Sequence, residues 1–207
     1  MQKYQSEIRT EAQARSISHL FHFTPFENLT SILNIGMVSQ KALAEDVTDG
    51  IITDPKRWDN YPDHICFSVH GINDEMFRLK KRNHPNWAVI AVDISVIWEQ
   101  SCRFCWRNAA SNEIRQTHGF IGGPWAFSKM FDDEPMSAID SRSRRQVLDL
   151  QECCPTDPQA EVQVKDKVAI EKVVEIVVVS EGHKARIEAI KESRDRHIPV
   201  TVIDWIK

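Results

Sequence analysis

Apolar blocks alternate with polar segments that contain glycine or proline along the whole chain, a pattern typical of a mixed α/β (α+β) fold. Near-continuous apolar runs at 87–94 and 173–179 predict strands that are buried on both faces. Residues 160–164 alternate, as in a strand with one buried face. Further strands are predicted at 19–23, 65–69 and 200–203. Because the chain has no repeat and no linker-like stretch, residues 1–207 are expected to form one domain.

Helices are predicted where apolar spacing coincides with residues that start or stop a helix. Leu29, Ile32 and Leu33 form a buried stripe, and Gly36 is a stop signal just beyond it. The sequence Thr24-Pro25-Phe26-Glu27 predicts a capping box for this helix, with Pro25 at the first helical position. Other helices are expected over residues 1–16, from Asn73 to Arg82, in short pieces within 98–131 and from about Glu181 to Arg194. Residues 40–62 and 141–159 are expected to be long loops.

The composition is that of a globular protein. Of the 207 residues, 42% are hydrophobic and 27% are charged, which disfavours disordered, collagen-like and membrane-spanning classes. The net charge of −4 argues against binding nucleic acid by bulk charge, although a local basic groove remains compatible with it. No run approaches the ~18 apolar residues of a membrane helix, and the N-terminus lacks a signal-peptide core, so a cytoplasmic location is expected.

Several familiar chemistries are disfavoured by the motif content. The pair Cys102-x-x-Cys105 has no second pair at zinc-finger spacing, and the adjacent Cys153 and Cys154 are poorly spaced for one. We therefore expect no metal, and reduced thiols that behave as small buried hydrophobes. Phosphate-loop, nucleophile-elbow and dinucleotide fingerprints are absent, and the chain holds only seven glycines.

Four segments, taken in order, form a more specific pattern. His22 is the only histidine on a predicted core strand directly before a helix. The segments are Phe21-His22-Phe23-Thr24 followed by Asn28-Leu29, Ser31-Ile32-Leu33 and Gly36; Arg57 followed by Ile65-Cys66-Phe67-Ser68 and Asn73-x-x-Met76-Phe77; Phe104-Cys105-Trp106-Arg107-Asn108-Ala109-Ala110-Ser111; and Pro155-Thr156-Asp157-Pro158-Gln159-Ala160-Glu161-Val162. Their order and spacing, from about residue 17 to 165, resemble the DarT family of nucleic-acid ADP-ribosyltransferase toxins. Residues 104–111 look like the guanine-modifying branch.

The resemblance implies a fold and an activity. The fold would be the split-sheet ADP-ribosyltransferase type, with NAD⁺ held between two small sheets. The enzyme would transfer ADP-ribose from NAD⁺ to a base of single-stranded DNA and release nicotinamide. Members of the family are toxins of toxin–antitoxin and phage-defence systems, and their usual antitoxin partner is a macrodomain protein.

By the same resemblance, Glu161 is the catalytic carboxylate. Nicotinamide leaves its ribose as a neutral molecule, so no general acid is needed and one carboxylate can suffice, unlike the pair used by glycosidases. That carboxylate is needed where positive charge develops on the ribose. Glu161 follows a proline-rich loop and begins a predicted strand, where a side chain can face a cleft.

The resemblance also assigns residues to NAD⁺. Arg57 would clamp the pyrophosphate or assist the incoming base, and so act in both binding and catalysis. His22 and Thr24 would hydrogen-bond the adenosine ribose. The other residues expected to line the cofactor are Phe23, Ser31 and Ser39, with Ser68, Met76 and Phe77 as the nicotinamide wall.

A basic stretch suggests where the nucleic acid binds. From Met76 to Gln116 there are seven Lys and Arg residues against three Asp and Glu residues, with Trp106 inside the stretch and Trp125 just beyond it. Cations beside aromatic faces suit an unpaired strand, whose phosphates are neutralised while its bases stack. The candidate nucleic-acid contacts are Trp106, Arg107, Arg142, Arg144 and Arg145.

Other functions remain open on the sequence. Related toxins act on messenger RNA, so an RNA base is an alternative acceptor. A transferase acting on protein side chains would use the same carboxylate. A non-catalytic nucleic-acid-binding module would bind oligonucleotides and leave NAD⁺ unconsumed, and His22, Arg57 and Glu161 speak against it.

Overall fold

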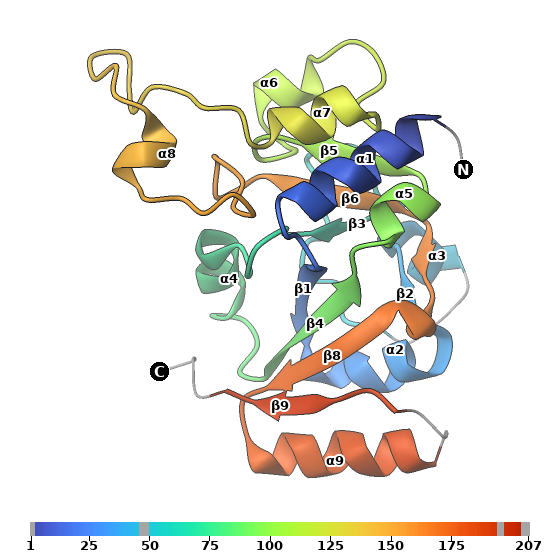
Figure 1. Cartoon of the computed structure of the whole chain (residues 1–207). Coiled ribbons are helices and arrows are strands. Elements are labelled where there is room, and N and C mark those ends of the chain that lie inside the picture. The colour runs from blue at the N-terminus through green and yellow to red at the C-terminus, as the bar shows by residue number, and fades with distance from the viewer. Residues whose placement is uncertain (1–2, 46–49, 194–196, 204–207) are drawn as a thin grey trace.

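Three β-sheets organise the chain in the computed structural model, which describes residues 3–45, 50–193 and 197–203 (Figure 1). The four-stranded sheet has the order β1-β4-β8-β9, the three-stranded sheet the order β3-β6-β5, and β2 pairs with β7. The strands are β1 (His19–Pro25), β2 (Met37–Val38), β3 (His64–Phe67), β4 (Trp87–Asp93), β5 (Cys102–Cys105), β6 (Glu161–Lys165), β7 (Lys167–Val168), β8 (Val173–Val178) and β9 (Val200–Val202). This is a mixed α/β fold with split sheets, as predicted.

Helices surround the two larger sheets. In Figure 1, α1, α5 and α7 lie around the three-stranded sheet, and α2 and α9 lie at the opposite end, where they contact each other. The helices are α1 (Lys3–Ala14), α2 (Leu29–Ile35), α3 (Gln40–Glu45), α4 (Asp74–Lys80), α5 (Val96–Glu99), α6 (Asn112–Arg115), α7 (Pro124–Lys129), α8 (Arg144–Val147) and α9 (Glu181–Glu192), with 3₁₀ turns at Phe26–Asn28 and Ile170–Lys172. None of the described helices is long and apolar enough to cross a membrane.

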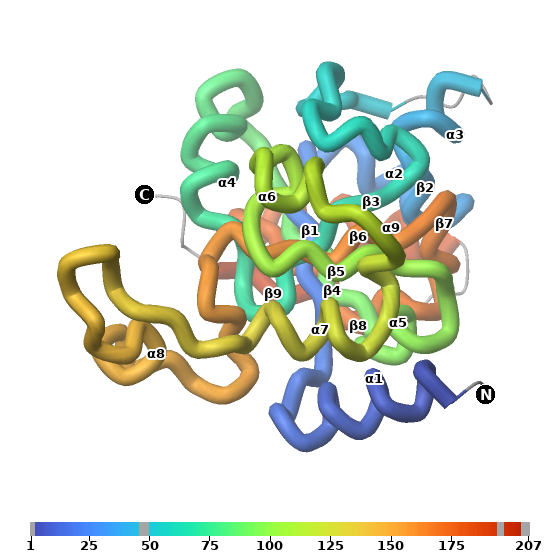
Figure 2. Tube along the Cα trace, turned by 90° about the horizontal axis from the view of Figure 1, so that it is seen from above, coloured from blue at the N-terminus to red at the C-terminus, as the bar shows by residue number. Residues whose placement is uncertain are grey.

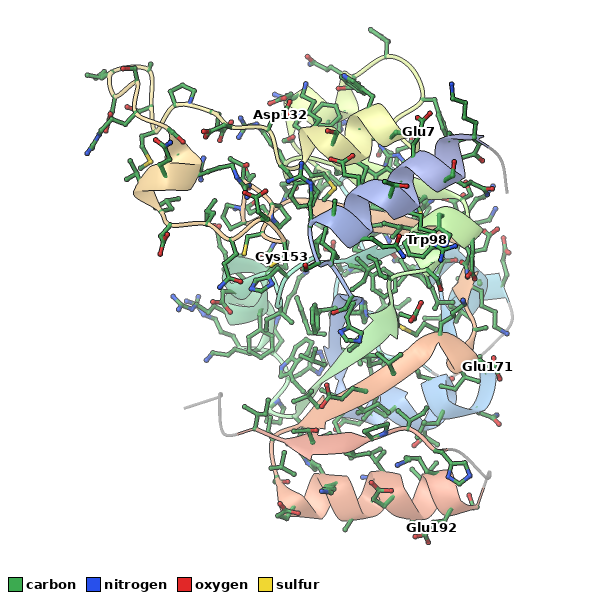
Figure 3. All side chains as sticks on the ribbon, viewed as in Figure 1. Glu7, Trp98, Asp132, Cys153, Glu171 and Glu192 are labelled. Atoms are coloured by element: carbon green, nitrogen blue, oxygen red, sulfur yellow. The ribbon has the colours of Figure 1, made fainter. Side chains whose placement is uncertain are left out.

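The first helix lies on the surface, as expected, but one of its faces is buried. Ile8 and Ala12 are inaccessible to solvent, and α1 packs against α5 and α7. The guanidinium of Arg9 lies 6.0 Å from the centroid of the Trp98 ring; Trp98 is labelled in Figure 3. By contrast, the segment that carries α8 extends away from the body in both views (Figures 1 and 2).

The two larger sheets meet at one short seam. Phe21 of β1 and Ser68, just after β3, form an isolated antiparallel bridge with two backbone hydrogen bonds of 2.9 Å. Next to it, the Nδ1 atom of His22 lies 2.8 Å from the carbonyl oxygen of Cys66. Strand β1 therefore joins the two sheets through its middle residues, Phe21 and His22.

The predicted capping box at Thr24 is wrong. Pairing of Thr24 with Ala88 and of Pro25 with Trp87 carries β1 two residues further, and a 3₁₀ turn precedes α2. The Thr24 hydroxyl instead accepts a hydrogen bond of 2.9 Å from the side chain of Asn28. The predicted stop is confirmed, because Gly36 ends α2 with a φ of 83°, a conformation that suits glycine.

Other boundaries also differ from the sequence-based predictions. The expected loop at 40–62 begins with helix α3, and the stretch 98–131 contains strand β5 as well as short helices. In β6 three consecutive residues are buried rather than alternate ones, because Val162 and Val164 face the hydrophobic core while Gln163, on the other face, is covered by the loop that carries Asp59. The expected end of the last helix at Arg194 lies outside the described residues.

Candidate active site

Five polar or thiol side chains share one face of the three-stranded sheet. Cys66 of β3, Gln163 of β6 and Arg103 of β5 are direct cross-strand neighbours. In the next row, Glu161 pairs with Cys105. Because residues two apart in a strand point to the same side, Glu161 lies on the same face of the sheet as Gln163.

The predicted catalytic residue, Glu161, has a defined set of partners. Its Oε1 atom accepts a hydrogen bond of 2.9 Å from the backbone amide of Ala109, and its carboxylate accepts another from the thiol of Cys66. Burial raises the pKa of Glu161, and the two hydrogen bonds oppose that shift without cancelling it. One carboxylate is thus fixed in place, and its ionisation is sensitive to its neighbours.

Arg57 lies in the loop before β3 and is locked onto Asp59. The guanidinium donates to both carboxylate oxygens of Asp59, at 3.0 and 2.6 Å, and to the carbonyl oxygen of His64 at 2.7 Å. Burial favours a lower pKa for Arg57, but the bonds to Asp59 raise it above its ordinary value, and the charge of Glu161 adds to this. The two predicted catalytic residues are therefore close enough to interact electrostatically.

The backbone of Arg57 is strained. Its φ is 36°, which a residue with a side chain adopts at a cost of about 1–3 kcal/mol. Asp59 is nearly buried, with 6% of its side chain exposed. Burial favours a higher pKa for Asp59, but the hydrogen bonds from Arg57 lower it, so both groups remain charged. The loop is therefore held against its local preference by this ion pair.

Gln163 connects this loop to the sheet. It is 0% exposed, and its Nε2 atom donates to Asp59 Oδ2 at 2.6 Å and to Cys66 Sγ at 3.6 Å. Its Oε1 atom accepts from the guanidinium of Arg103, which lies over the ring of Tyr61, 3.3 Å from the centroid. A continuous polar network therefore runs from the edge strand β5 to the loop before β3.

His22 reaches the same site from the seam. Burial lowers the pKa of His22, and the positive charge of Arg57 contributes to the shift, so the neutral imidazole is favoured. Its contact with the Cys66 carbonyl places it directly beside the strand whose thiol contacts Glu161. The structure therefore brings together His22, Arg57 and Glu161 from three separate segments.

The residues expected to line NAD⁺ fall into two groups. Phe23 packs edge-on against Phe77 and Trp87, with ring centroids 5.4 and 5.6 Å away. Phe77 is 4% exposed, so in this conformation it is mainly a core residue. Met76 lies in the first turn of α4 and is half-buried, and its backbone amide donates to the side chain of the N-cap residue Asn73 at 3.0 Å. The cap predicted at Asn73 is confirmed.

The polar members of this set serve the backbone around the site. Thr24 holds Asn28, whose side chain donates to the Ile51 carbonyl at 3.0 Å and accepts from the Ile51 amide at 2.7 Å. Ser39 is buried, and its hydroxyl accepts from the Ala42 amide at 3.3 Å. Ser31, on α2, and Ser68, at the seam, are half-buried. Their roles toward NAD⁺ stay predictions.

The nucleic-acid residues predicted near β5 are engaged within the protein. Trp106 is 6% exposed, whereas its neighbour Trp125, whose ring centroid lies 5.5 Å away, is 60% exposed. The ammonium group of Lys129 lies 4.1 and 5.2 Å from the two ring centroids. The guanidinium of Arg107 forms salt bridges with Glu113, Glu134 and Asp157. Of the two indoles, Trp125 is the one open to a base.

The three arginines around α8 differ in what they contact. Arg142 is exposed and pairs with Asp140 at 2.7 Å, while Arg144 pairs with Glu134 at 2.8 Å. Arg145 donates to the carbonyl of Cys154, to the hydroxyl of Thr156 and to the carbonyl of Gln151, each at 2.9 Å. Arg145 therefore fixes the segment that leads to Glu161, and its contact with nucleic acid stays a prediction.

Cys102 and Cys105 lie three residues apart on β5, so their side chains point to opposite faces. Both are buried, and burial raises the pKa of each thiol to about 12. Both are buried as the sequence indicates, but each thiol also donates a weak hydrogen bond, Cys102 to the Val96 carbonyl at 3.7 Å and Cys105 to Gln163 Oε1 at 3.8 Å.

Sequence reasoning missed the groups that hold the site together. Asp59 follows Arg57 by two residues, a spacing that could have signalled a local ion pair. Gln163 follows Glu161 by two residues, and strand periodicity places both on one face. Nothing in the sequence pairs Gln163 with Asp59, because the two residues are 104 positions apart.

The site thus combines a fixed carboxylate, an arginine and a neutral histidine close to the seam of the two sheets. The family model described as "ssDNA thymidine ADP-ribosyltransferase, DarT" matches residues 21–205. The chain therefore belongs to the DarT family of ADP-ribosyltransferases. No match was found among curated proteins.

Solved structures of DarT proteins share the fold at low sequence identity. Thermus sp. 2.9 DarT in complex with ADP-ribosylated ssDNA has a TM-score of 0.62 at 11% identity, covering 91% of this chain and 95% of that one. The same protein in complex with NAD⁺ has a TM-score of 0.60 at 13% identity, and the match covers 91% of this chain and 96% of that one. Thermosipho africanus DarTG in complex with ADP-ribose gives 0.55 at 13% identity. The match covers 90% of this chain and 50% of the other, so this chain spans half the length of that relative.

Proposed function

We propose that this enzyme transfers ADP-ribose from NAD⁺ to a nucleobase of single-stranded DNA and releases nicotinamide. The observation that carries the proposal is the convergence of His22, Arg57 and Glu161 at the seam of the two sheets. Membership of the DarT family supports the reaction class. The Thermus complexes with NAD⁺ and with ADP-ribosylated ssDNA support the donor and the acceptor.

The ionised carboxylate of Glu161 would act on the ribose of NAD⁺. As the bond to nicotinamide breaks, positive charge develops on the ribose, and a fixed carboxylate in a partly dry site stabilises that charge more strongly than water does. The Ala109 amide and the Cys66 thiol hold the carboxylate in one orientation, so little reorganisation is needed during the reaction. No proton has to reach nicotinamide, because it departs as a neutral molecule.

Arg57 and His22 would position the dinucleotide. The guanidinium stays charged at all working pH values and is aimed by Asp59, which suits it to a pyrophosphate. The neutral imidazole of His22 can hydrogen-bond a ribose hydroxyl. The remaining residues that we propose to line NAD⁺ are Phe23, Thr24, Ser31, Ser39, Ser68, Met76 and Phe77.

The acceptor we propose is a guanine base, because residues 104–111 resemble the guanine-modifying branch, whereas the family description names thymidine. Trp125 and the arginines around α8 are the proposed contacts for the unpaired strand. As a toxin of this family, the enzyme would act in the cytoplasm against the host or an infecting phage. It would require a cognate antitoxin, which we propose is a macrodomain protein, and the DarTG relative supports a partner of this system.

Incubation of the enzyme with NAD⁺ and matched DNA and RNA oligonucleotides, followed by mass spectrometry, tests this function. We expect an ADP-ribose adduct on guanine-containing single-stranded DNA and free nicotinamide in equal amount. Glu161→Gln should lower the rate roughly 10²–10³-fold, whereas Glu192→Gln, an exposed residue on α9, should not. Adducts on thymine alone would refute guanine as the modified base. Adducts on RNA alone would refute DNA as the acceptor. Full activity of Glu161→Gln would refute the proposed role of the carboxylate.

A further inference from the structure

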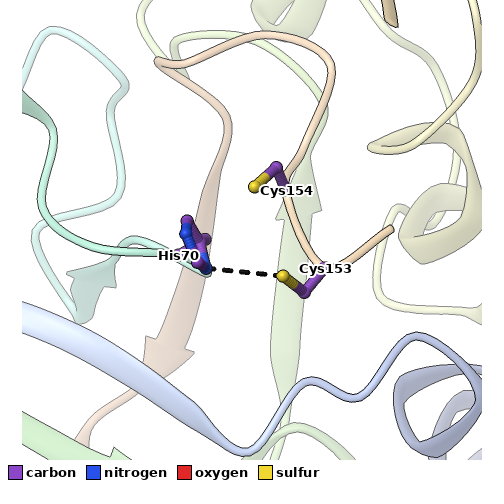
Figure 4. Close-up of side chains that lie close together, drawn as sticks. All are labelled: His70, Cys153 and Cys154. Atoms are coloured by element: carbon purple, nitrogen blue, oxygen red, sulfur yellow. Dashed lines mark hydrogen bonds between the residues drawn. The ribbon is translucent and has the colours of Figure 1, made fainter. Parts of the chain in front are cut away.

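A thiol and imidazole cluster lies outside the residues assigned above to catalysis, NAD⁺ or nucleic acid. His70, Cys153 and Cys154 come together so that their ligand atoms all lie within 4.8 Å of one another (Figure 4). The Nδ1 atom of His70 is 3.5 Å from the Sγ atom of Cys153. The two partners are 83 positions apart in the sequence, which explains why sequence spacing alone argued against a metal site.

The cluster joins two segments that flank the candidate active site. His70 follows β3 and lies two residues beyond Ser68 of the seam, while Cys153 and Cys154 lie in the segment that leads into β6 and Glu161. In the overview, Cys153 lies where this segment returns to the body from α8 (Figure 3). A link between the two segments would therefore fasten the approach to Glu161.

The turn that carries the thiols is already fixed. The Cys154 amide donates to the Gln151 carbonyl at 2.9 Å, and Arg145 donates to both the Cys154 and the Gln151 carbonyls at 2.9 Å. Such bonds hold the backbone in one conformation, so only side-chain torsions need to adjust on binding a ligand. The turn is therefore largely pre-organised, which lowers the entropy cost of binding.

The spacing of the ligand atoms suits a small tetrahedral ion. Zinc bonds of about 2.3 Å to sulfur and about 2.0 Å to nitrogen place the two ligand atoms roughly 3.5 Å apart in a tetrahedron. The observed separation of His70 Nδ1 and Cys153 Sγ is also 3.5 Å. Thiolate and imidazole together are the ligand types that prefer zinc over magnesium or calcium.

The surroundings favour a cation and admit it from solvent. His70 and Cys154 line a cavity of about 530 Å³ that is also lined by Asp74, Glu75 and Asp157 and by one cation, Arg78. Asp157 is paired with Arg107, so Asp74 and Glu75 against Arg78 leave the lining with a small negative charge that favours a cation. Cysteine binds such an ion as a thiolate, so binding would release thiol protons.

We propose that His70, Cys153 and Cys154 bind one divalent cation of the zinc class, with solvent in the fourth position. The bound ion holds the segment before Glu161 against the chain that follows β3. This proposal does not depend on the function proposed above, because it concerns binding and stability rather than turnover.

Titration of the reduced, metal-stripped protein with Co²⁺ and then Zn²⁺ tests the proposal. We expect a thiolate-to-cobalt charge-transfer band that saturates at one ion per chain and disappears when Zn²⁺ is added. At free zinc about one hundred times its dissociation constant, the thermal midpoint should rise by roughly 5–10 °C. Cys153→Ser, Cys154→Ser and His70→Asn should each lower the affinity at least tenfold, whereas His118→Asn, at an exposed loop histidine, should not.

A second measurement needs no variant. Zn²⁺ should slow alkylation of Cys153 and Cys154 in the wild-type protein, as mapped on peptides by mass spectrometry, and chelation should restore the rate. The absence of a cobalt–thiolate band in folded protein would overturn the proposal. An unchanged band in all three variants, or thiols that Zn²⁺ does not protect, would do the same.

Discussion

The buried amide of Gln163 offers a sharp test of how the site is held. In Gln163→Leu the side-chain volume is nearly kept, but Asp59 loses its 2.6 Å donor. A hydrogen bond to a charged group contributes about 1.5–3 kcal/mol. Asp59 keeps its bonds to Arg57. Arg103, which also loses its bond to Gln163, is half-buried and can bind water instead. The lost stability therefore comes mainly from the one hydrogen bond to Asp59. At about 2–4 °C per kcal/mol, the thermal midpoint should fall by roughly 3–12 °C.

The same substitution should slow the proposed reaction, because Asp59 aims the guanidinium of Arg57. A misplacement of about 1 Å can cost roughly 100-fold in rate, so kcat/KM for NAD⁺ should fall by ten- to one-hundredfold. Differential scanning fluorimetry and nicotinamide release measure the two effects. Gln116→Leu, at an exposed position, is the matched control. If Gln163→Leu kept both the wild-type midpoint and the wild-type rate, the reasoning about this network would be refuted.

Three further outcomes follow from the same geometry. Because burial raises the folded-state pKa of Glu161, its ionisation destabilises the protein at neutral pH; Glu161→Gln should raise the thermal midpoint at pH 7, and the gain should vanish below pH about 4.5. Because the Cys66 thiol lowers the pKa of Glu161, Cys66→Ala should shift the acid limb of the pH–rate profile to higher pH, and Cys66→Ser should restore it. Gly36→Ala should destabilise the fold by about 2 kcal/mol or more in urea unfolding, because its Cβ would lie 2.6 Å from the Val168 carbonyl at a φ of 83°; unchanged stability would contradict this.

Strands and helices with strong local signals could be predicted from the sequence. The apolar run of β4 and the stop at Gly36 are local features, and the structure has both. The strand β5 was missed because it is four residues long and alternates with Arg103, which makes it look like part of a polar connection. The capping box failed because pairing with β4 outweighed the local preference of Thr24 and Pro25 for a helix start.

For the site too, local features could be predicted from the sequence and long-range contacts could not. Glu161, Arg57 and His22 could be proposed from residues that resemble a family, since each belongs to a short segment with recognisable neighbours. The contacts that orient them could not, because the bonds from Gln163 to Asp59 and from Ala109 to Glu161 join positions 104 and 52 residues apart. Such contacts depend on which strands pair, and strand order is not encoded in any one segment.

The two larger sheets therefore contribute differently to the stability of the fold. In β4 six of seven residues are buried, and in the four-stranded sheet this strand packs between β1 and β8, so that sheet contributes mainly apolar burial. The three-stranded sheet turns one face to charged groups, and burying Glu161, Asp59 and Arg57 there opposes folding unless each is paired. Because the sheets are joined by the Phe21–Ser68 bridge and the His22 contact, stability gained in one sheet can offset the cost of holding charges in the other.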